Sequence, residues 1–301
     1  MFDPSLPALN NFLLAIFLFG LLGIAHFIAH KHNILGHKDM RNRLHVAWVI
    51  ALMGLPAVLY PKSLGLVLWA FIPLLAWQEW IAQMQVKDKS QTDTWWLGIG
   101  IYLAQVACVA AVAEALPEYG WATAILPALV IIAAIIERPW PRWVSAGIAA
   151  TLLLPALALP LLMHARLSVL VWCFVIPQLF DAFQYIVGRK WGRTKLSRWS
   201  PNKTWEGLLG GACLAWLCAM ALSPWLPWPE MQTAQMTVLL LAASYCGGLA
   251  SSMLKRLLGL KDWSTLLGSH GGVLDRMDSL VFAIPIAWAL YTWHLQFGLT
   301  R

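Results

Sequence analysis

The chain has 301 residues, of which 60% are hydrophobic and 12% charged, and its formal net charge is +7. Its mean hydropathy of +0.66 excludes an ordinary soluble domain, in which about a quarter of the residues are charged. The basic excess does not indicate nucleic acid as a partner, because the basic residues follow the connecting segments of a membrane protein.

Apolar runs long enough to cross a bilayer follow one another along the whole chain. The second and fifth runs are short, so the number of spans is nine or ten. The sequence therefore predicts an all-α, polytopic transmembrane bundle, with scaffold helices in 1–165 and a catalytic region in 166–301 of one membrane domain. The predicted spans are roughly 9–29, 45–60, 63–82, 96–116, 121–137, 144–163, 167–187, 207–228, 235–254 and 279–298.

Lys and Arg are distributed unequally between the connecting segments on the two sides. Of the 21 basic residues, 18 fall in alternate segments, which the positive-inside rule places in the cytoplasm. Both termini then lie on the other side, and basic side chains attract anionic lipid headgroups. We expect an integral protein of a bacterial-type inner membrane with a polar site facing the cytoplasm. The basic segments are 30–44, 83–95, 138–143, 188–206 and 255–278.

The first half of the chain shows little polar chemistry. Glu79 and Glu114 lie near predicted helix ends, where a carboxylate reaches headgroups or water, so we expect interfacial residues without a catalytic duty. His30, His32 and His37 lie in a basic loop, for which a solvated surface is favoured over a metal site. The five cysteines lie in apolar segments without metal-ligand spacing, which argues against disulfides and zinc.

Asp181 lies inside an apolar run, where a carboxylate costs several kcal/mol unless it faces a polar cavity or a cation. A structural hydrogen bond to a neighbouring helix is the alternative. The stretch Ser-Pro-x-Lys-Thr-x-Glu-Gly begins at Ser200, just before the next predicted helix. Lys203, Thr204 and the N–H groups of that helix start suit a phosphate, and Glu206 complements the helix dipole. Taken alone, the basic residues here also fit a cytoplasmic loop.

The segment 252–278 gathers charged residues between two apolar runs, with paired glycines beside His270. Asp275 and Asp278 are three apart at the start of the last predicted helix and so face the same way. Two carboxylates at this spacing repel each other unless something positive lies between them. A divalent cation that also holds nucleotide phosphates fits, since magnesium uses one or two carboxylates plus substrate oxygens. Arg276 has the alternative of pairing with Asp262.

The order S-x-x-K-R-x4-K-D-x-S-x2-L-G-x-H-G-G-V-x-D-R-x-D, from Ser252 to Asp278, resembles the signature of the phosphatidate cytidylyltransferases, or CDP-diacylglycerol synthases. The stretch 181–207 resembles the upstream element of the same family. Together the two motifs cover 180–280, whereas the earlier spans are similar only in being hydrophobic.

The resemblance implies a membrane enzyme that joins CTP to phosphatidate, forming CDP-diacylglycerol and releasing pyrophosphate. It also implies Mg²⁺ as the cofactor, with a second cation, monovalent or divalent, as an open question, and a homodimer as the assembly. It implies no nucleic acid partner.

Carried over by position, the functional residues of the family fall into three groups. The metal and nucleotide site would comprise Asp181, Asp275 and Asp278. The substrate-binding residues would be Ser200, Lys203, Thr204, Glu206, Ser252, Gly271 and Gly272. The catalytic group would be Lys255, Arg256, Lys261, Asp262, His270 and Arg276, of which the four basic residues Lys255, Arg256, Lys261 and Arg276 would neutralise phosphates.

The chain also departs from the family pattern. The family has G-D-L-x-E-S before K-R, whereas this chain has Gly248 and Ser251 at the two acidic positions. The usual P-G before the histidine is Leu267-Gly268. These losses indicate a divergent paralogue. They leave open nucleotidyl transfer to another lipid phosphate, and a non-catalytic or transport protein descended from the enzyme.

Overall fold

The computed structural model describes residues 23, 78–80, 82–83, 166–197, 200, 202–264 and 271–297. In these residues it shows five α-helices with defined bounds and the 3-10 turn η4 (Ser223–Trp225), and residues 23, 78–80 and 82–83 are also helical. Across this part of the chain the only β-pairing is an isolated bridge between Lys195 and Thr204. The all-α prediction is confirmed for the described residues. The helices are α7 (Leu167–Trp191), α8 (Trp205–Leu222), α9 (Glu230–Leu257), α10 (Val273–Met277) and α11 (Leu280–Phe297).

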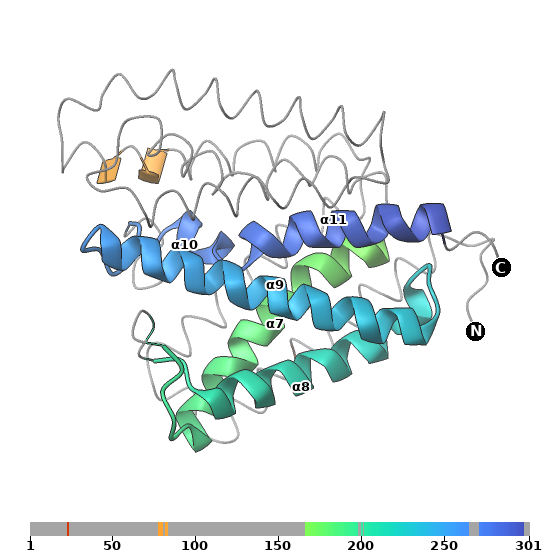
Figure 1. Ribbon diagram of the computed structural model, residues 1–301, viewed down its shortest axis with the longest axis horizontal. Helices are drawn as coiled ribbons and strands as arrows, with labels where there is room; N and C mark the ends of the chain where they lie inside the picture. The colour runs from red at the N-terminus through yellow and green to blue at the C-terminus, as the bar shows by residue number, and fades with distance from the viewer. Residues whose placement is uncertain are drawn as a thin grey trace.

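The helices form a layered bundle whose ends carry the loops. In Figure 1, α8, α9 and α11 run along the long axis of the molecule, and α7 crosses obliquely behind α9. α7 packs along α8, and α11 packs along α9. The short helix α10 lies at the end of the bundle where α9 ends and α11 begins.

Small residues bring α7 and α8 together. Gly207, Gly211, Ala215 and Ala219 recur every fourth residue of α8 and are all buried. A Cβ at Gly211 would lie only 2.6 Å from the backbone nitrogen of Gln184 on α7. Such stripes let two backbones approach closely, which is how helices in membranes gain packing energy.

Three helices are long and apolar enough to cross a membrane: Ser168–Trp191, Trp205–Trp225 and Glu230–Leu257. They correspond to the predicted spans 167–187, 207–228 and 235–254. The predicted span 279–298 corresponds to α11, whose shorter apolar part is Leu280–Tyr291. Six predicted spans fall almost wholly outside the described residues, so nine or ten spans and the division at residue 165 stay predictions.

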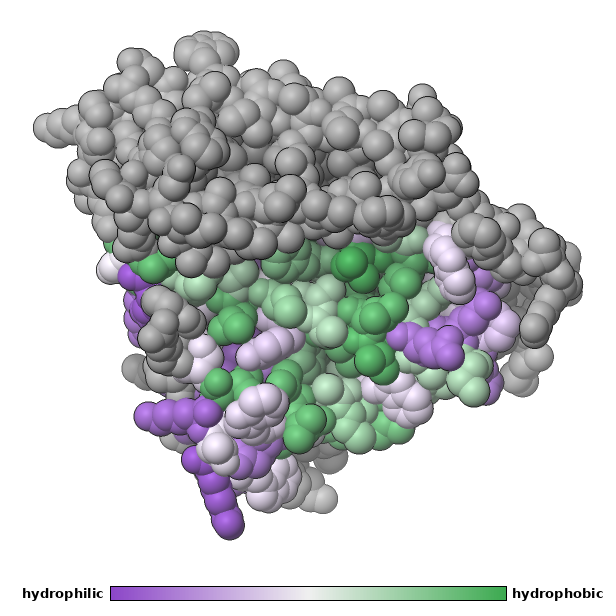
Figure 2. Space-filling model, in the orientation of Figure 1, coloured by the Kyte–Doolittle hydropathy of each residue, from purple (hydrophilic) through white to green (hydrophobic). Residues whose placement is uncertain are grey.

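The surface of the bundle is apolar between two polar ends. Large apolar side chains of α8 and α9 are exposed, among them Leu209, Leu217, Met231 and Val238. Figure 2 shows this apolar face in green, with hydrophilic residues in purple at both ends. The pattern is that of helices which meet lipid along their length and water at their ends.

Candidate active site

Charged side chains from four segments lie at one end of the bundle. Asp181 lies on α7, Lys203 directly precedes the N-cap of α8, and Lys255 is in the last turn of α9. Asp275 is in α10, and Asp278 is in the turn before α11. The last predicted helix is therefore interrupted, with one aspartate on either side of the end of α10.

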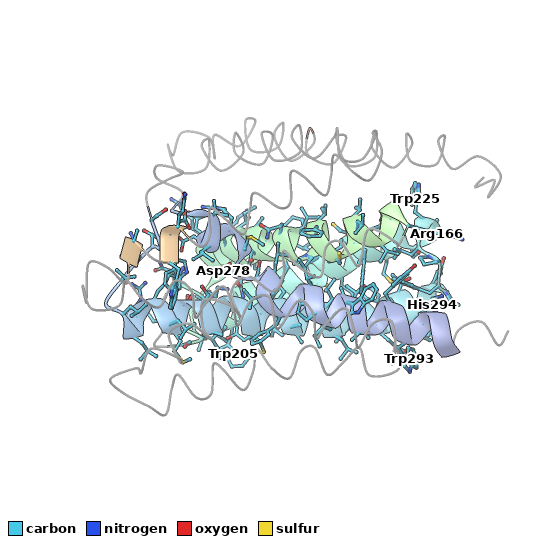
Figure 3. All side chains as sticks on the ribbon, turned by 90° about the horizontal axis from the view of Figure 1, so that it is seen from above. Arg166, Trp205, Trp225, Asp278, Trp293 and His294 are labelled. Atoms are coloured by element: carbon cyan, nitrogen blue, oxygen red, sulfur yellow. The ribbon has the colours of Figure 1, made fainter. Side chains whose placement is uncertain are left out.

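Lys255 is the positive group between the two aspartates. Its Nζ lies 2.6 Å from Oδ1 of Asp275 and 3.9 Å from Oδ2 of Asp278. Its side chain is only 10% exposed, so the ammonium depends on these carboxylates for compensation of its charge. Figure 3 shows Asp278 remote from the end of the bundle that carries Arg166 and His294.

Asp275 has both carboxylate oxygens occupied by donors of its own chain. Oδ1 accepts from Lys255, and Oδ2 accepts from the backbone N–H groups of Trp263 and Gly272, both at 2.8 Å. Gly271 has a φ of +74°, a left-handed conformation that glycine adopts without steric cost. Asp275 therefore ties the end of α9, the following turn and the start of α10 together, and a metal ion would compete with three donors for its oxygens.

Glu79 is a residue of this region that the sequence analysis missed. It is only 5% exposed. Its carboxylate accepts from Ser264 Oγ at 2.7 Å and from the N–H groups of Val273 and Leu274 at 2.8 and 3.0 Å. The expectation that Glu79 is an interfacial residue is thus wrong, because its carboxylate is buried against the motif. The available signal was a carboxylate in an apolar run and a glycine-rich loop whose N–H groups need acceptors.

Asp181 and Lys203 form the second half of the charged cluster. Lys203 Nζ lies 3.6 Å from Oδ1 of Asp181 and 5.7 Å from the centre of the Tyr245 ring. A separation of 3.6 Å is long for a charge-assisted hydrogen bond, so both groups keep capacity for a further partner. The two side chains are 31% and 20% exposed, so a ligand can reach them.

The charge of Asp278 is compensated less than that of Asp275. Oδ1 of Asp278 accepts from the N–H of Ser279 at 2.7 Å, and among the described residues its Oδ2 has the long contact of 3.9 Å with Lys255. Burial raises the pKa of Asp278 to about 6; the ammonium of Lys255 opposes this rise, and the charge of Asp181 adds to it. A raised pKa means that the ionised form would gain from another positive partner.

The carboxylates of Asp181 and Asp278 have the chemistry that would suit a magnesium ion. Asp181 and Asp278 offer hard oxygen ligands, and magnesium typically takes one or two carboxylates and completes its shell with phosphate oxygens and water. A divalent cation would offset the poorly compensated charge of Asp278. In the part of the chain that the structure describes, no group of three or more His, Cys, Asp or Glu side chains is placed to hold a metal. Because both oxygens of Asp275 already accept from donors of the chain, Asp181 and Asp278 fit the ion better than Asp275 does.

The two glycines at 247 and 248 let α9 approach the charged cluster. A Cβ at Gly247 would lie 2.8 Å from the carbonyl oxygen of Asp278, and a Cβ at Gly248 would lie 3.3 Å from Lys203 Nζ. The position where the family signature has an aspartate thus points at the Lys203 ammonium. Ser251, at the other acidic position, is buried, and its hydroxyl accepts from Trp263 Nε1 at 3.3 Å.

The segment between α7 and α8 is held to the first turn of α8. Thr204 is the N-cap, and its hydroxyl accepts from the backbone N–H three residues later at 3.1 Å. Glu206 accepts from the N–H of Arg193 at 3.1 Å and from the N–H and hydroxyl of Thr194 at 3.2 and 2.9 Å. The carboxylate of Glu206 is therefore used to hold this loop.

The other predicted site residues have different surroundings or lie outside the described residues. Arg256 is exposed and donates to the carbonyl of Leu260 at 3.0 Å. Lys261 and Asp262 are exposed in the turn that follows α9. Ser200, Ser252 and Arg276 are partly buried, and the carbonyl of Ser200 accepts from the N–H of Lys203 at 3.0 Å. His270, Leu267 and Gly268 lie outside the described residues. The roles assigned to all of these residues stay predictions.

Comparison with known proteins shows which family the chain belongs to. The model of the cytidylyltransferase family matches residues 41–294, which is most of the chain. The chain belongs to the cytidylyltransferase family. The match includes all four charged segments and Glu79, and it extends the resemblance from the motifs at 180–280 into the first half of the chain.

Several relatives in the cytidylyltransferase family carry the name phosphatidate cytidylyltransferase. That of Pseudomonas aeruginosa is 36% identical over 208 residues, which are 63% of this chain and 76% of the relative. That of Synechocystis is 42% identical over 110 residues, 36% of this chain and 38% of the relative. The chloroplastic enzyme 5 of Arabidopsis thaliana is 39% identical over 116 residues, 38% of this chain and 29% of the relative. The alignments with the last two therefore span well under half of those proteins.

Proposed function

We propose that this protein transfers CMP from CTP to phosphatidate, giving CDP-diacylglycerol and pyrophosphate. The observation that carries the proposal is the charged cluster at one end of an apolar bundle, in which Asp181 lies 3.6 Å from Lys203 and Asp278 lies 3.9 Å from Lys255. A soluble triphosphate and a lipid phosphate can meet only at a membrane surface, and this cluster lies at the end of helices that are long enough to cross one.

The reaction requires stabilisation of the charge on the phosphoryl oxygens more than it requires proton transfer. A lipid phosphate oxygen attacks the α-phosphorus of CTP, a new P–O bond forms, and the bond to pyrophosphate breaks. The attacking phosphate monoester is already an anion at neutral pH, so no general base is required. Preorganised positive groups that face the phosphoryl oxygens lower the barrier, since they do not reorganise during the reaction.

The two lysines have complementary roles in this proposal. Lys203 has one long contact with Asp181, so its ammonium is available to a phosphate. Lys255 is held by Asp275 at 2.6 Å and presents a fixed charge beside Asp278. The magnesium ion, when bound by Asp181 and Asp278, would neutralise phosphoryl oxygens and help the pyrophosphate to leave.

The site faces the cytoplasm in this proposal, because CTP is a cytoplasmic substrate and the basic segments 188–206 and 255–278 follow the positive-inside rule. Anionic headgroups would gather at the same surface. A homodimer remains part of the proposal, supported by the family resemblance.

The decisive experiment is an assay of the purified protein in mixed micelles with CTP, Mg²⁺ and phosphatidate. We expect release of pyrophosphate in equal amounts with CDP-diacylglycerol. Omission of Mg²⁺ or of the lipid should reduce the rate to background. No pyrophosphate with any phosphorylated lipid and any divalent cation would remove the proposal.

A related lipid phosphate is the second candidate acceptor. It is favoured by Gly248 and Ser251, which replace the two acidic residues of the family signature. Gly248 leaves Lys203 with Asp181 beside it but without the second aspartate that the family signature has at position 248, and Ser251 hydrogen-bonds Trp263 instead of presenting a carboxylate. A panel of lipid phosphates with different headgroups and chain numbers, compared by kcat/KM, would separate the two acceptors.

A further inference from the structure

We propose that Glu79 is a positioning residue, which fixes the start of α10 and thereby holds Asp275 and Asp278 in place against Lys255. The catalytic consequence rests on the proposed function, whereas the positioning itself does not. Residues 78–80 and 82–83 are helical, and Figure 1 shows them in orange close to α10 and to the end of α9.

The contacts of Glu79 converge on the segment that carries the aspartates. One carboxylate oxygen accepts from the hydroxyl of Ser264 and the N–H of Val273, and the other accepts from the N–H of Leu274. Helix starts leave N–H groups without intrahelical acceptors. Glu79 supplies acceptors for two of them in α10, from a part of the chain almost 200 residues away.

The space around this carboxylate is filled. A Cβ at Gly272 would collide with the Glu79 carboxylate, so residue 272 must be glycine while Glu79 keeps its place. The neighbouring side chains make the same connection: the amide of Gln83 donates to the carbonyl of Trp263 at 2.6 Å, and the rings of Trp80 and Trp263 lie 5.3 Å apart. Glu79, Trp80 and Gln83 thus contact the chain on both sides of residues 265–270.

The path from Glu79 to the lysine has two steps. Glu79 holds Val273 and Leu274 at the start of α10, and Asp275 is the next residue. Asp275 in turn accepts from Lys255 and from the N–H of Trp263. A shift of α10 would therefore move both the ion pair at 2.6 Å and Asp278, which follows the same short helix.

A carboxylate suits this position better than an amide. All three of its hydrogen-bond partners are donors, and a carboxylate accepts with both oxygens. In Glu79→Gln one oxygen becomes an NH₂ group, which would face donors and leave at least one of them unpaired. Glu79→Asp keeps the two acceptors and shortens the side chain by one methylene.

The first test measures positioning without turnover. Amide hydrogen exchange at Val273 and Leu274 should be slow in the intact protein and at least tenfold faster in Glu79→Gln. Glu230→Gln, which changes an exposed carboxylate in the first turn of α9, is the matched control and should leave these two amides unchanged. Unchanged exchange at Val273 and Leu274 in Glu79→Gln would overturn the proposal.

The second test asks whether Glu79 acts through Asp275. Glu79→Gln should lower kcat at least tenfold, with the KM for the lipid changed less than twofold, and Glu79→Asp should retain more of the kcat than Glu79→Gln. In the double variant Glu79→Gln/Asp275→Asn the loss should be clearly smaller than the product of the two single losses, because both changes break one connected set of contacts. Multiplicative losses, as expected for Glu230→Gln/Asp275→Asn, would contradict this step.

The two proposals fail in different ways. If the intact protein shows no CTP turnover with any acceptor, the proposed function is wrong, and hydrogen exchange at Val273 and Leu274 still decides the role of Glu79. If turnover is present and both Glu79 variants match the intact protein in exchange and in kcat, the proposed function stands and the role of Glu79 is wrong.

Discussion

Asp275 and Asp278 are three residues apart but have different surroundings, and we infer different roles from this difference. Asp275 accepts from a lysine and from two backbone N–H groups. Asp278 accepts from one N–H group and has a lysine at 3.9 Å. An oxygen that already holds strong donors is a poor ligand for a further cation, so we infer that Asp275 organises the site and that Asp278 serves the ligand.

Replacement of the two aspartates by asparagine should separate these roles. Asp278→Asn should lower kcat by at least 100-fold and change the thermal unfolding temperature little. Asp275→Asn should also reduce the free energy of unfolding, by about 3–5 kcal/mol, because it leaves the buried Lys255 without its close partner. Activity assays and thermal unfolding in detergent measure both effects. Equal stability of the two variants would contradict the division of roles.

The pH dependence of metal binding should report Asp278. Burial raises its pKa to about 6, so the carboxyl group is neutral below that pH and cannot serve as a ligand. The apparent affinity for Mg²⁺ should therefore be constant above pH 7 and fall about tenfold per pH unit below pH 6, since one proton competes with the ion. Titration of turnover with Mg²⁺ between pH 5 and 8 checks this, and a flat affinity would rule out Asp278 as the titrating ligand.

At the scale of helices, close contact between α7 and α8 places Asp181 beside Lys203. The Gly207 and Gly211 backbones lie against Gln184, and a Cβ at either position would lie 2.6–2.7 Å from backbone atoms of that residue. Asp181 is one turn before Gln184 in α7, and Lys203 directly precedes the N-cap of α8. Separation of the two helices would therefore also separate the lysine from the carboxylate.

The substitution Gly211→Ala should therefore destabilise the protein although alanine favours helices. The greater helix propensity of alanine contributes about 1 kcal/mol, whereas overpacking of a filled contact costs about 1–3 kcal/mol. We expect a net loss of stability in thermal unfolding and a lower kcat. Cys213→Ala changes an exposed residue of the same helix and should alter stability by no more than about 0.5 kcal/mol. A stabilised Gly211→Ala variant would show that α7 and α8 are less closely packed.

At the scale of the whole molecule, the charged cluster lies away from the end of the bundle that carries Trp225, Trp293 and His294 (Figure 3). Figure 3 shows Trp225, Trp293 and His294 near one end, with Asp278 toward the other. The apolar surface between them is the face that lipid would cover (Figure 2). This polarity of the bundle is what a membrane enzyme with one soluble and one lipid substrate requires.

Sided labelling should test the orientation of the bundle. In a variant whose five cysteines are replaced by alanine, Lys195→Cys in the loop before α8 should react with a membrane-impermeant maleimide only from the cytoplasmic side. Glu230→Cys, at the exposed start of α9, should react only from the opposite side. Labelling of both positions from one side would contradict the proposed topology.

Composition and local pattern determined the membrane-protein class, the helical character of the described spans and the order of the motifs, because hydropathy and helix starts are properties of neighbouring residues. Glu206 in the first turn of α8 followed from such a local rule. Charge repulsion between Asp275 and Asp278 led to the expectation of a divalent cation between them; the ammonium of Lys255 lies there in the structure, and the cation stays a prediction.

Only the tertiary structure decided which oxygens are already occupied and which residues of the first half reach the site. The sequence predicts that Glu79 is an interfacial carboxylate, yet Glu79 accepts hydrogen bonds from residues that are 185 to 195 positions away in the chain. Gly248 stands in the sequence where the family signature has an aspartate, and only the structure shows that a Cβ there would lie 3.3 Å from Lys203 Nζ. Contacts between residues so distant in sequence depend on how whole helices pack, and no local pattern of polar and apolar residues contains that information.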